Sequence, residues 1–423
     1  MKRITTITSI LAIILVGGLF GYRYLPGLWP AIGPAPDGIG DGNTTSIPLS
    51  IPPGFSIEIF ADNVPGARVI AFDVSSMWVS QTSEGTITEI YIENGEFNGK
   101  GLVLKNLNKP HGIAVDWEND VRYIAEEHRI ARITQLPTFH APEGILEPIA
   151  DLPSGNGHYT RTIKFGPDNR LYVSVGSSCN VCLESDDRRA KIFTVDTAKK
   201  TMTEFARGLR NTVFFTWHPK TGQMWGTDMG RDLLGDDVPP DEINILGIGS
   251  PSTGSGQNSP SANFGWPICY GQNIHDTEFD KNTYIRNPCM EPFEMPSTID
   301  VPAHSAPLGL AFIPWDSMWW PEDYRGDLIV AYHGSWNRSD PTGYKLVRHK
   351  FSPSGTYEGV EDFVTGWLTP QGALGRPVDV VFGPDHNLYV SDDKVGVVYR
   401  ICPPPGEPPY DKRIPRLCDG SFD

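Results

Sequence analysis

Short apolar runs alternate with polar turns along most of the chain, a pattern that predicts strands rather than long helices. Two turns are nearly identical and lead into the same β-rich segment. They read GPDNRLYVSVG from Gly166 and GPDHNLYVSDD from Gly383. Weaker copies of this segment occur at four other places. The β-rich triplets begin at Met77, Arg122, Leu171, Met224, Leu328 and Leu388. Such a repeat of one turn and one strand predicts a β-propeller.

The spacing of the triplets predicts six blades. Successive triplets begin 45, 49, 53, 104 and 60 residues apart, and a four-stranded blade takes about 40 to 50 residues. Short apolar strands precede five of the turns, which predicts hairpins; they read GIAV, TIKF, VFFTW, GLAF and VDVVF. The long fourth interval holds a Gly/Ser/Pro-rich stretch, 247–261, and two cysteines, which indicates an insertion rather than a seventh blade. The predicted fold class is therefore all-β, a six-bladed β-propeller. An array of β-sandwiches is the alternative, but sandwiches do not require the same turn in every unit.

The two ends of the chain are predicted to lie outside the propeller, which spans residues 53–404. Residues 1–24 place a Lys-Arg pair before a long uncharged stretch, which predicts an export signal peptide or an uncleaved membrane anchor. The anchor is slightly favoured because no Ala-x-Ala cleavage site follows, and a buried core helix is the least favoured interpretation. Residues 25–52 are expected to form a Gly/Pro-rich linker, and 405–423 a C-terminal tail that a disulfide ties back.

Six cysteines, all beyond residue 170, indicate an oxidising compartment. Six cysteines allow 15 pairings. Proximity in the sequence favours Cys179 with Cys182, Cys269 with Cys289, and Cys402 with Cys418. The CNVC segment is alternatively half of a zinc site or a redox dithiol, but no second CxxC or HxxxH occurs and no thioredoxin-like pattern surrounds it. With the leader, the cysteines predict an extracytoplasmic location, periplasmic or at the cell surface.

The charge balance and the absence of several motifs exclude some classes of function. The chain has 35 Lys plus Arg and 51 Asp plus Glu, a net charge of −16. Its overall field repels phosphate backbones and anionic lipid, so we expect no nucleic-acid partner, and membrane contact only through the N-terminal segment. Neither GxGxxG nor a P-loop is present, which argues against a nucleotide-bound cofactor, and neither GxSxG nor HExxH occurs.

Histidine and arginine recur just before the apolar strands. Equivalent positions in radially repeated blades lie at one height around the axis, so these residues should ring one mouth of the central channel. They are His111, the HYTR run from His158 to Arg161, Arg210 with Asn211, His304 with Ser305, and Arg376. A single such residue would more often only solvate a strand end. Five groups at one rim of an acidic protein predict a hollow that binds a small polycarboxylate or phosphate.

At this point the chain resembles the quinoprotein sugar dehydrogenases of the glucose and sorbosone dehydrogenase type. The resemblance spans about residues 53–402 and rests on the order of short segments. They read HYTRTIKFGPDNRLYVSVGSSCNVC, RGLRN, DEINIL followed by NFGWP, AHSAPLGLAF, GDLIVAYHGSWNR and GRPVDVVFGPD. It implies a propeller whose central mouth binds pyrroloquinoline quinone (PQQ) and calcium. It also implies oxidation of an aldose or a related sugar or aldehyde by hydride transfer, with electrons passed to an external acceptor, because no haem-binding CxxCH is present.

The resemblance also implies roles for individual residues. His158 corresponds to the general base that takes a proton from the substrate hydroxyl, and Arg210 with Asn211 to the pair that polarises the quinone oxygen. The residues implied to bind PQQ are Arg161, Arg210, Asn211, Arg376, His333, His111 and Met229. Calcium is assigned to the backbone carbonyls of Gly230 and Arg231, with Asp232 beside them.

The chain departs from the glucose-oxidising branch at several of these positions. Met229 stands in place of a polar amide, Arg231 in place of proline, and His333 in place of a lysine near the cofactor. Ser177 occupies the place of an acid that would orient the base. The sugar is therefore left open. Two other functions stay as alternatives: a propeller that binds a sugar or partner without catalysis, and a calcium-dependent lactonase-like hydrolase. The hydrolase is disfavoured because such enzymes hold their metal with acidic and amide side chains, whereas this rim is rich in arginine and histidine.

Overall fold

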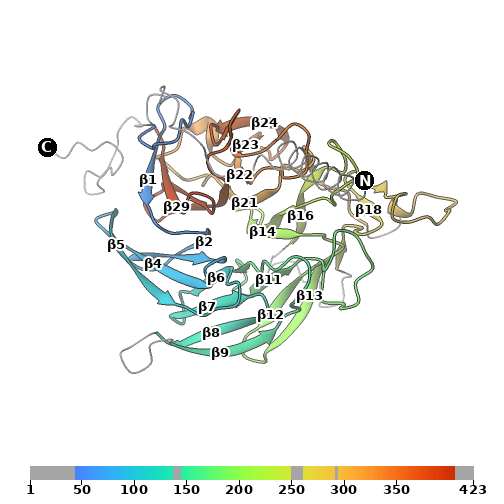
Figure 1. The fold of residues 1–423 in the computed structure, drawn as a ribbon, viewed down its shortest axis with the longest axis horizontal. Helices are drawn as coiled ribbons and strands as arrows, with labels where there is room; N and C mark the ends of the chain where they lie inside the picture. The colour runs from blue at the N-terminus through green and yellow to red at the C-terminus, as the bar shows by residue number, and fades with distance from the viewer. Residues whose placement is uncertain (1–42, 137–143, 249–260, 291–293, 405–423) are drawn as a thin grey trace, which may run out of the picture.

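Six large β-sheets surround a common centre in the computed structural model, which describes residues 43–136, 144–248, 261–290 and 294–404 (Figure 1). Each sheet is one blade of a propeller. The first strand of each blade lies at the centre, where it contacts inner strands of neighbouring blades, and the next strands follow outward in chain order, except for the outermost strand of the sixth blade. The all-β, six-bladed propeller predicted from the sequence is confirmed.

The first three blades are continuous in the sequence. One contains β2 (Ala67–Phe72), β3 (Ser76–Gln81), β4 (Thr86–Glu93) and β5 (Glu96–Leu104). The next contains β6 (Gly112–Asp116), β7 (Val121–Glu126), β8 (Arg129–Gln135) and β9 (Ile145–Asp151). The third contains β10 (Ile163–Phe165), β11 (Leu171–Val175), β12 (Lys191–Asp196) and β13 (Thr201–Arg207), to which β17 (Ala262–Asn263) is added in parallel.

The other three blades include the insertion and the closure of the ring. The fourth contains β14 (Thr212–Trp217), β15 (Gln223–Asp228), β16 (Asp241–Ile248) and β20 (Ile299–Val301). The fifth contains β21 (Pro307–Phe312), β22 (Leu328–Tyr332), β23 (Lys345–Phe351) and β24 (Tyr357–Val364). The sixth combines β27 (Pro377–Phe382), β28 (Leu388–Asp392) and β29 (Val397–Cys402) with β1 (Ser56–Ala61) from the start of the propeller. The antiparallel pairing of β1 with β29 closes the ring.

The repeated GPD turn has a physical explanation. The Tyr172 hydroxyl donates to the Asp168 carboxylate at 2.8 Å, and the Tyr389 hydroxyl donates to Asp385 at the same distance. In both turns the third residue after Gly has a positive φ, 58° at Asn169 and 63° at His386, which Asn and His tolerate better than most residues. The aspartate therefore fixes the turn to the strand that follows it, and both tyrosines are buried between blades.

The long interval in the repeat is an insertion, as predicted, between the third and fourth strands of the fourth blade. It contains the short hairpin of β18 (Cys269–Tyr270) and β19 (Ile274–His275) and the 3-10 helix η2 (Pro288–Met290). Elsewhere the chain adds η3 (Glu322–Tyr324) and the two-stranded pair β25 (Leu368–Thr369) and β26 (Gly372–Ala373). None of these changes the sixfold arrangement.

Two of the three predicted disulfides are confirmed, Cys179–Cys182 and Cys269–Cys289. The third prediction pairs Cys402, which is disulfide-bonded, with Cys418, which lies outside the described residues. The predicted leader, 1–24, and tail, 405–423, also lie outside them. Among the described residues, no helix has the length and apolar character needed to cross a bilayer.

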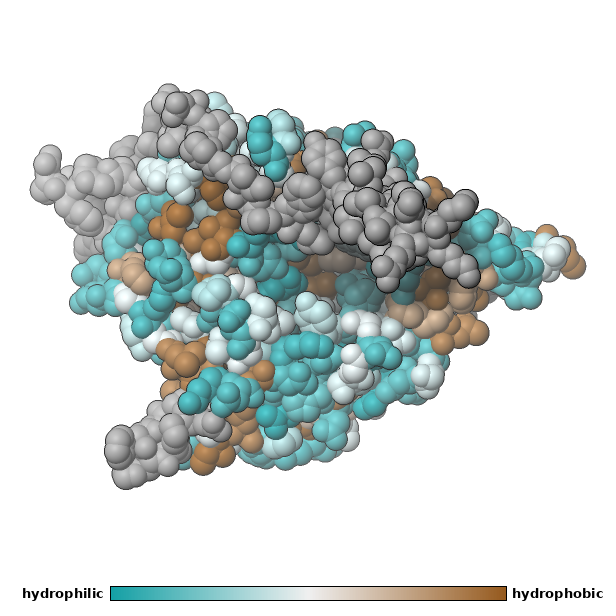
Figure 2. Space-filling view, in the orientation of Figure 1, coloured by the Kyte–Doolittle hydropathy of each residue, from teal (hydrophilic) through white to brown (hydrophobic). Residues whose placement is uncertain are grey.

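The end of the predicted linker packs against the propeller. Ile47 and Leu49 are buried in the core between the fifth and sixth blades, and Ser50 pairs with Thr365 in an isolated bridge. Apolar surface buried in this way stabilises the fold by about 25 cal/mol per Å². The face in Figure 2 is hydrophilic over much of the blades formed by β6 to β13, with small hydrophobic patches between them.

Candidate active site

A cavity of about 320 Å³ opens at the mouth of the central channel where the innermost strands begin. Three arginines and three histidines from different blades line it, together with polar residues and a methionine. Its walls include Arg68, His158, Arg210, Asn211, Met229, Gly230, Asp232, His304, His333 and Arg376. A wider hollow of about 500 Å³ adjoins it and shares Arg68, Tyr159 and Arg376. The structure thus brings together most of the residues that the sequence singled out.

Three predicted residues do not line this cavity. Arg161 is fully buried and donates to the backbone carbonyls of Pro153, His158 and Thr160 at 2.6 to 2.9 Å. His111 is also fully buried, with Nδ1 3.3 Å from the hydroxyl of Thr162. Burial lowers its pKa well below the usual value.

The side chain of the third such residue, Arg231, leaves the mouth for the insertion. Its Nη1 lies 2.6 Å from the carboxylate of Asp276, which is almost fully buried. The prediction for Arg231 concerned its backbone carbonyl, which this salt bridge leaves available. The salt bridge therefore ties the predicted metal loop to the inserted segment.

Buried carboxylates orient the arginines at the strand starts. Asp228, the last residue of β15, accepts hydrogen bonds from the backbone N–H groups of Arg210 and Asn211 at 3.0 and 2.8 Å. In the sixth blade Asp392, the last residue of β28, accepts the backbone N–H of Arg376 at 3.0 Å. Burial raises the pKa of Asp228 to about 6 and that of Asp392 to about 7. The same position in two blades therefore presents an arginine to the channel mouth.

The guanidinium of Arg210 is held on several sides, and only 5% of its side chain is exposed. Nε donates to the carbonyl of Asn180 at 2.9 Å, and Nη2 donates to Asn180 Oδ1 at 2.9 Å and to Asp232 Oδ2 at 2.8 Å. Nη1 lies 3.3 Å from the carbonyl of Met229. This arrangement fixes one direction for the cation at the edge of the cavity.

His158 is held by the backbone and hydroxyl of one serine. Its Nδ1 lies 3.1 Å from the Ser177 carbonyl oxygen and 3.0 Å from Ser177 Oγ. The hydroxyl proton of Ser177 is directed to the carbonyl of Cys179 at 2.8 Å. Both Ser177 oxygens can therefore only accept from the imidazole, so Nδ1 carries the proton and Nε2 keeps a lone pair. Burial and the nearby Arg210 lower the pKa of His158 to about 3.

A glycine makes this approach possible. A Cβ atom on Gly176 would lie 2.6 Å from Asn211 Oδ1 and 2.7 Å from His158 Cβ. These separations are shorter than side chains tolerate, so only glycine lets His158 and Asn211 lie against the end of β11. The backbone N–H of Ser177 also donates to the carbonyl of Arg210 at 2.8 Å, which joins the third and fourth blades at the site.

On the opposite wall the charges form a linked group. Arg68 donates to Asp393 at 2.8 Å, and His333 Nε2 lies 3.0 Å from the same carboxylate. Arg376 donates to the carbonyls of His333 and Gly334. Burial would raise the pKa of Asp393, but His333 and Arg68 hold it well below its usual range. Burial and Arg376 lower the pKa of His333 to about 4.

The predicted metal loop has few free side-chain oxygens. One Asp232 oxygen accepts from Arg210 and the other accepts from Asn337 at 2.9 Å. Asp241 accepts the backbone N–H groups of Gly230 and Ala306 at 2.9 and 2.8 Å, and burial raises its pKa to about 7. Over the described ranges, both clusters of three potential side-chain metal ligands contain disulfide-bonded cysteines, and neither includes a residue of this metal loop.

Several residues at the site were not singled out from the sequence. Arg68 lies at the start of β2, the innermost strand of the first blade, so the rule used for the other blades would have found it. Asn180 and Asp241 come from a loop and from a third strand, for which the repeat gives no signal, whereas Trp336 and Asn337 lie in the HGSWNR segment that the sequence analysis quotes. The buried atoms Arg68 Nε, Asn211 Oδ1 and Asn337 Oδ1 have no hydrogen-bond partner in the described part of the chain.

Comparison with known proteins defines the class to which this fold and site belong. Residues 49–403 match the TrAA12-like family, and the chain belongs to it. The resemblance to PQQ-dependent sugar dehydrogenases that the sequence predicted is confirmed.

Two individual relatives match most of this chain at low sequence identity. A Borreliella burgdorferi protein described as uncharacterized is 30% identical over 366 residues, covering 84% of this chain and 90% of its own. A pyrroloquinoline quinone-dependent pyranose dehydrogenase of Coprinopsis cinerea is 23% identical over 84% of this chain. The match spans 54% of that enzyme, about half its length.

Solved structures show the same fold at low sequence identity. The holo form of the pyranose dehydrogenase PQQ domain from Coprinopsis cinerea superposes with a TM-score of 0.67 at 21% identity, covering 86% of this chain and 99% of that one. The calcium structure of the Trichoderma reesei carbohydrate-active enzyme of family AA12 has a TM-score of 0.70 at 18% identity, covering 85% and 99%.

Proposed function

We propose that the protein is a PQQ-dependent oxidoreductase that oxidises an aldose or a related sugar or aldehyde and passes the electrons to an external acceptor. The observation that carries the proposal is the cavity that Arg68, Arg210 and Arg376 line together with a neutral His158. The relatives that use PQQ and sugars support it. So do the disulfides, which suit an exported protein, periplasmic or at the cell surface.

The residues present fit PQQ, a flat molecule with several carboxylates. Guanidinium groups match carboxylates two oxygens at a time, and three of them converge here in a protein of net charge −16. Unpartnered buried atoms of Arg68 and Asn211 offer a donor and an acceptor to an occupant. We assign Arg68, Arg376 and His333 to the carboxylate side. PQQ supplies an electrophilic quinone carbonyl that accepts a hydride.

His158 is the proposed general base. Because Nδ1 donates to Ser177, the lone pair on Nε2 is available to take the proton of a sugar hydroxyl. The lowered pKa keeps the imidazole neutral at working pH. Arg161 helps to hold the backbone of His158 in place, since it donates to the His158 carbonyl at 2.9 Å.

Arg210 and Asn211 are proposed to stabilise negative charge that develops on an oxygen in the cavity. Donors that are fixed before the reaction stabilise such charge without reorganisation. The guanidinium of Arg210 is fixed by Asn180 and Asp232, and Asn211 Nδ2 lies 3.6 Å from the sulfur of Met229, a weak acceptor that leaves the amide free to act. The adjoining hollow, with Tyr159 on its wall, leaves room for the sugar.

Calcium fits the site less completely than PQQ does. The carboxylate of Asp232 is engaged by Arg210 and Asn337, so a hard cation would depend on the backbone carbonyls of Gly230 and Arg231 together with water. We propose that these carbonyls would be ligands of calcium, and we assign no step of the reaction to the ion.

The test is dye reduction by the purified protein. Apoprotein is incubated with PQQ, with and without calcium, and then supplied with a panel of aldopyranoses and aldehydes. Reduction of an electron-accepting dye that needs both PQQ and one of these substrates is expected. Lactone hydrolysis without PQQ, with no dye reduction, would support the hydrolase instead. Sugar binding without either reaction would support the non-catalytic alternative.

A further inference from the structure

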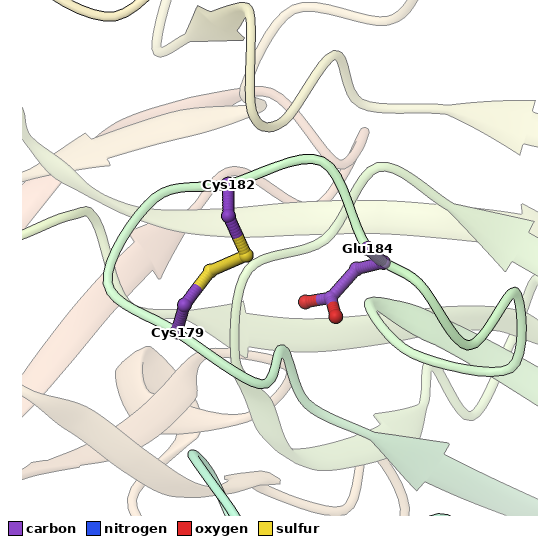
Figure 3. Close-up of side chains that lie close together, drawn as sticks. All are labelled: Cys179, Cys182 and Glu184. Carbon is purple, nitrogen blue, oxygen red and sulfur yellow. A yellow bond between two sulfur atoms is a disulfide. The ribbon is translucent and has the colours of Figure 1, made fainter.

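A four-residue disulfide loop lies directly beside the proposed catalytic residues. Cys179 and Cys182 are bonded three positions apart in the loop that follows β11, and Glu184 lies next to them (Figure 3). The carboxylate of Glu184 accepts the backbone N–H of Ser178 at 2.7 Å and its hydroxyl at 2.6 Å. The loop is thus held by a covalent bond and by a carboxylate at its base.

Asn180, which lies between the two cysteines of this loop, contacts both Arg210 and Asp232. Asn180 accepts from Arg210 through both its backbone carbonyl and its Oδ1, each at 2.9 Å. Its Oδ1 also accepts the backbone N–H of Asp232 at 2.7 Å, and its Nδ2 donates to the Asp232 carbonyl at 3.0 Å. One side chain therefore contacts the arginine and the backbone of the aspartate that pairs with it.

The same loop touches the base on its other side. Ser177, whose two oxygens accept from His158 Nδ1, donates its hydroxyl proton to the carbonyl of Cys179. The orientation of the Cys179 carbonyl, which the disulfide constrains, therefore sets the direction of the Ser177 hydroxyl. His158 and Arg210, from two blades, therefore both contact residues in or next to a single short loop.

We propose that Asn180 is a positioning residue for Arg210 and that the intact Cys179–Cys182 disulfide is what keeps it in place. The inference rests on the proposed function for its kinetic consequences, but its structural part concerns only residues of this chain. Reduction by an added dithiol breaks the S–S bond and forms two thiols. The dithiol gives up two electrons and two protons and becomes a disulfide itself. The loop would then lose its constraint at the channel mouth.

The positions of the two disulfides favour a local function for this one. Cys179 and Cys182 are partly exposed, whereas Cys269 and Cys289 are buried and join positions 20 residues apart in the insertion. A bond that closes a longer loop constrains the unfolded chain more. The short loop consequently contributes less to global stability than the long one, and it is also the one that a reductant reaches.

The first test compares Asn180→Ala with Asn180→Asp in protein loaded with PQQ. Alanine removes the side chain that joins Arg210 to Asp232, whereas aspartate keeps an acceptor for both. We expect kcat to fall by roughly 10- to 100-fold in Asn180→Ala, with the sugar KM within about threefold of wild type. Asn180→Asp should recover part of the loss, because it keeps the acceptor for Arg210 and for the Asp232 N–H but not the donor to the Asp232 carbonyl. Equal kcat in wild type and Asn180→Ala would overturn the proposal.

A second readout does not depend on activity. The rate at which phenylglyoxal labels Arg210 is measured by mass spectrometry in the full chain, with Arg376 as internal reference. Labelling of Arg210 should be several-fold faster in Asn180→Ala and in Cys179→Ser/Cys182→Ser, because the guanidinium is held less firmly once the contact with the Asn180 side chain is lost or loosened, while Arg376 labelling is unchanged. Unchanged Arg210 labelling in both variants contradicts the proposal even if the wild type proves to have another activity.

The matched control is Cys269→Ser/Cys289→Ser, which removes the other described disulfide, the one within the insertion. It should leave kcat and Arg210 labelling as in wild type, although its thermal midpoint falls. If this control lowers kcat as much as Cys179→Ser/Cys182→Ser does, the effect is a general loss of stability and the proposal is wrong. Absent dye reduction in wild type, with altered Arg210 labelling in the variants, would reject the proposed function and keep the positioning of Arg210.

Discussion

The two ends of the central channel are built from the same six strands and differ in almost every side chain. Where the strands begin, arginine, histidine and asparagine line a cavity of about 320 Å³. Where they end, a cavity of about 290 Å³ is lined mainly by aliphatic and aromatic residues, such as Phe72, Phe165 and Phe382. Lys164 and Asp379 are the charged residues of that described wall.

This difference teaches that the propeller supplies proximity and the sequence supplies the chemistry. Radial repetition brings six strand ends together at either mouth. At one mouth, buried carboxylates at the ends of second strands, Asp228 and Asp392, fix the backbone of the arginine beside them. At the other mouth Asp379 accepts only backbone N–H groups, from Ile70 and Val380. The polar mouth is therefore the one where a ligand and a reaction are expected.

The largest expected effect comes from removing the proposed base. His158→Ala should lower kcat by roughly 10²- to 10⁴-fold, the usual contribution of a positioned general base, while PQQ stays bound because the arginines are unchanged. Steady-state kinetics and the absorption of bound PQQ check the two halves. Full activity in His158→Ala would show that the reaction does not take place at the polar mouth.

The next effect concerns binding and compares the two mouths directly. Arg376→Ala should weaken PQQ binding by about 10- to 100-fold, because hydrogen bonds to charged groups contribute about 1.5 to 3 kcal/mol. Lys164→Ala is the matched loss of a cation at the apolar mouth and should leave the PQQ dissociation constant within about twofold. Fluorescence titration measures both. A weaker constant for Lys164→Ala than for Arg376→Ala would place the ligand at the wrong end.

A smaller effect is expected from adding one methyl group. Gly176→Ala places a Cβ between Asn211 and His158, and overpacking of this kind costs about 1 to 3 kcal/mol. If the site relaxes by moving His158, kcat falls about tenfold or more while most of the folded core is unchanged. Kinetics with a thermal melt as control tests this. A variant with the wild-type kcat would show that the tight approach at Gly176 is not needed.

The smallest expected effect is the contribution of His158 to the pH dependence of kcat/KM. Because the pKa of His158 is lowered from 6.5 to about 3, the neutral form persists as the pH falls through 6.5. His158 itself should change kcat/KM by less than about twofold between pH 8 and pH 5, whereas a histidine with the ordinary pKa would lose about 30-fold. Protonation of Asp228 and Asp392, whose pKa values are raised to about 6 and about 7, adds its own effect in this range. A direct titration of the His158 ring by NMR with its midpoint near pH 6.5 would contradict the environment described for the base.

Sequence reasoning predicted the blades because Asp168 and Asp385 leave the same turn signature in the chain. It placed Arg210, Asn211 and Arg376 at one mouth because each lies just before an innermost strand. It did not separate these from Arg161, which stands at a similar place but turns inward to three carbonyls. Side-chain direction at a strand start depends on neighbouring loops.

Asn180 could not be found from the repeat at all. It lies in a loop, and its partners Arg210 and Asp232 belong to another blade. No periodicity links a loop residue to partners in a different blade, so only the folded chain reveals the contact. The CNVC segment gave the disulfide but not what the disulfide holds.

The most direct measurement is a titration of the apoprotein with PQQ, followed by addition of an aldopyranose to the complex while its absorption spectrum is recorded. We expect saturable binding of one PQQ per chain at about micromolar concentration or below, and a spectrum that changes to that of the reduced quinone when the sugar is added. No saturation at concentrations of about 100 μM, or binding that Arg376→Ala leaves unchanged, would contradict the assignment of the polar mouth as a quinone site.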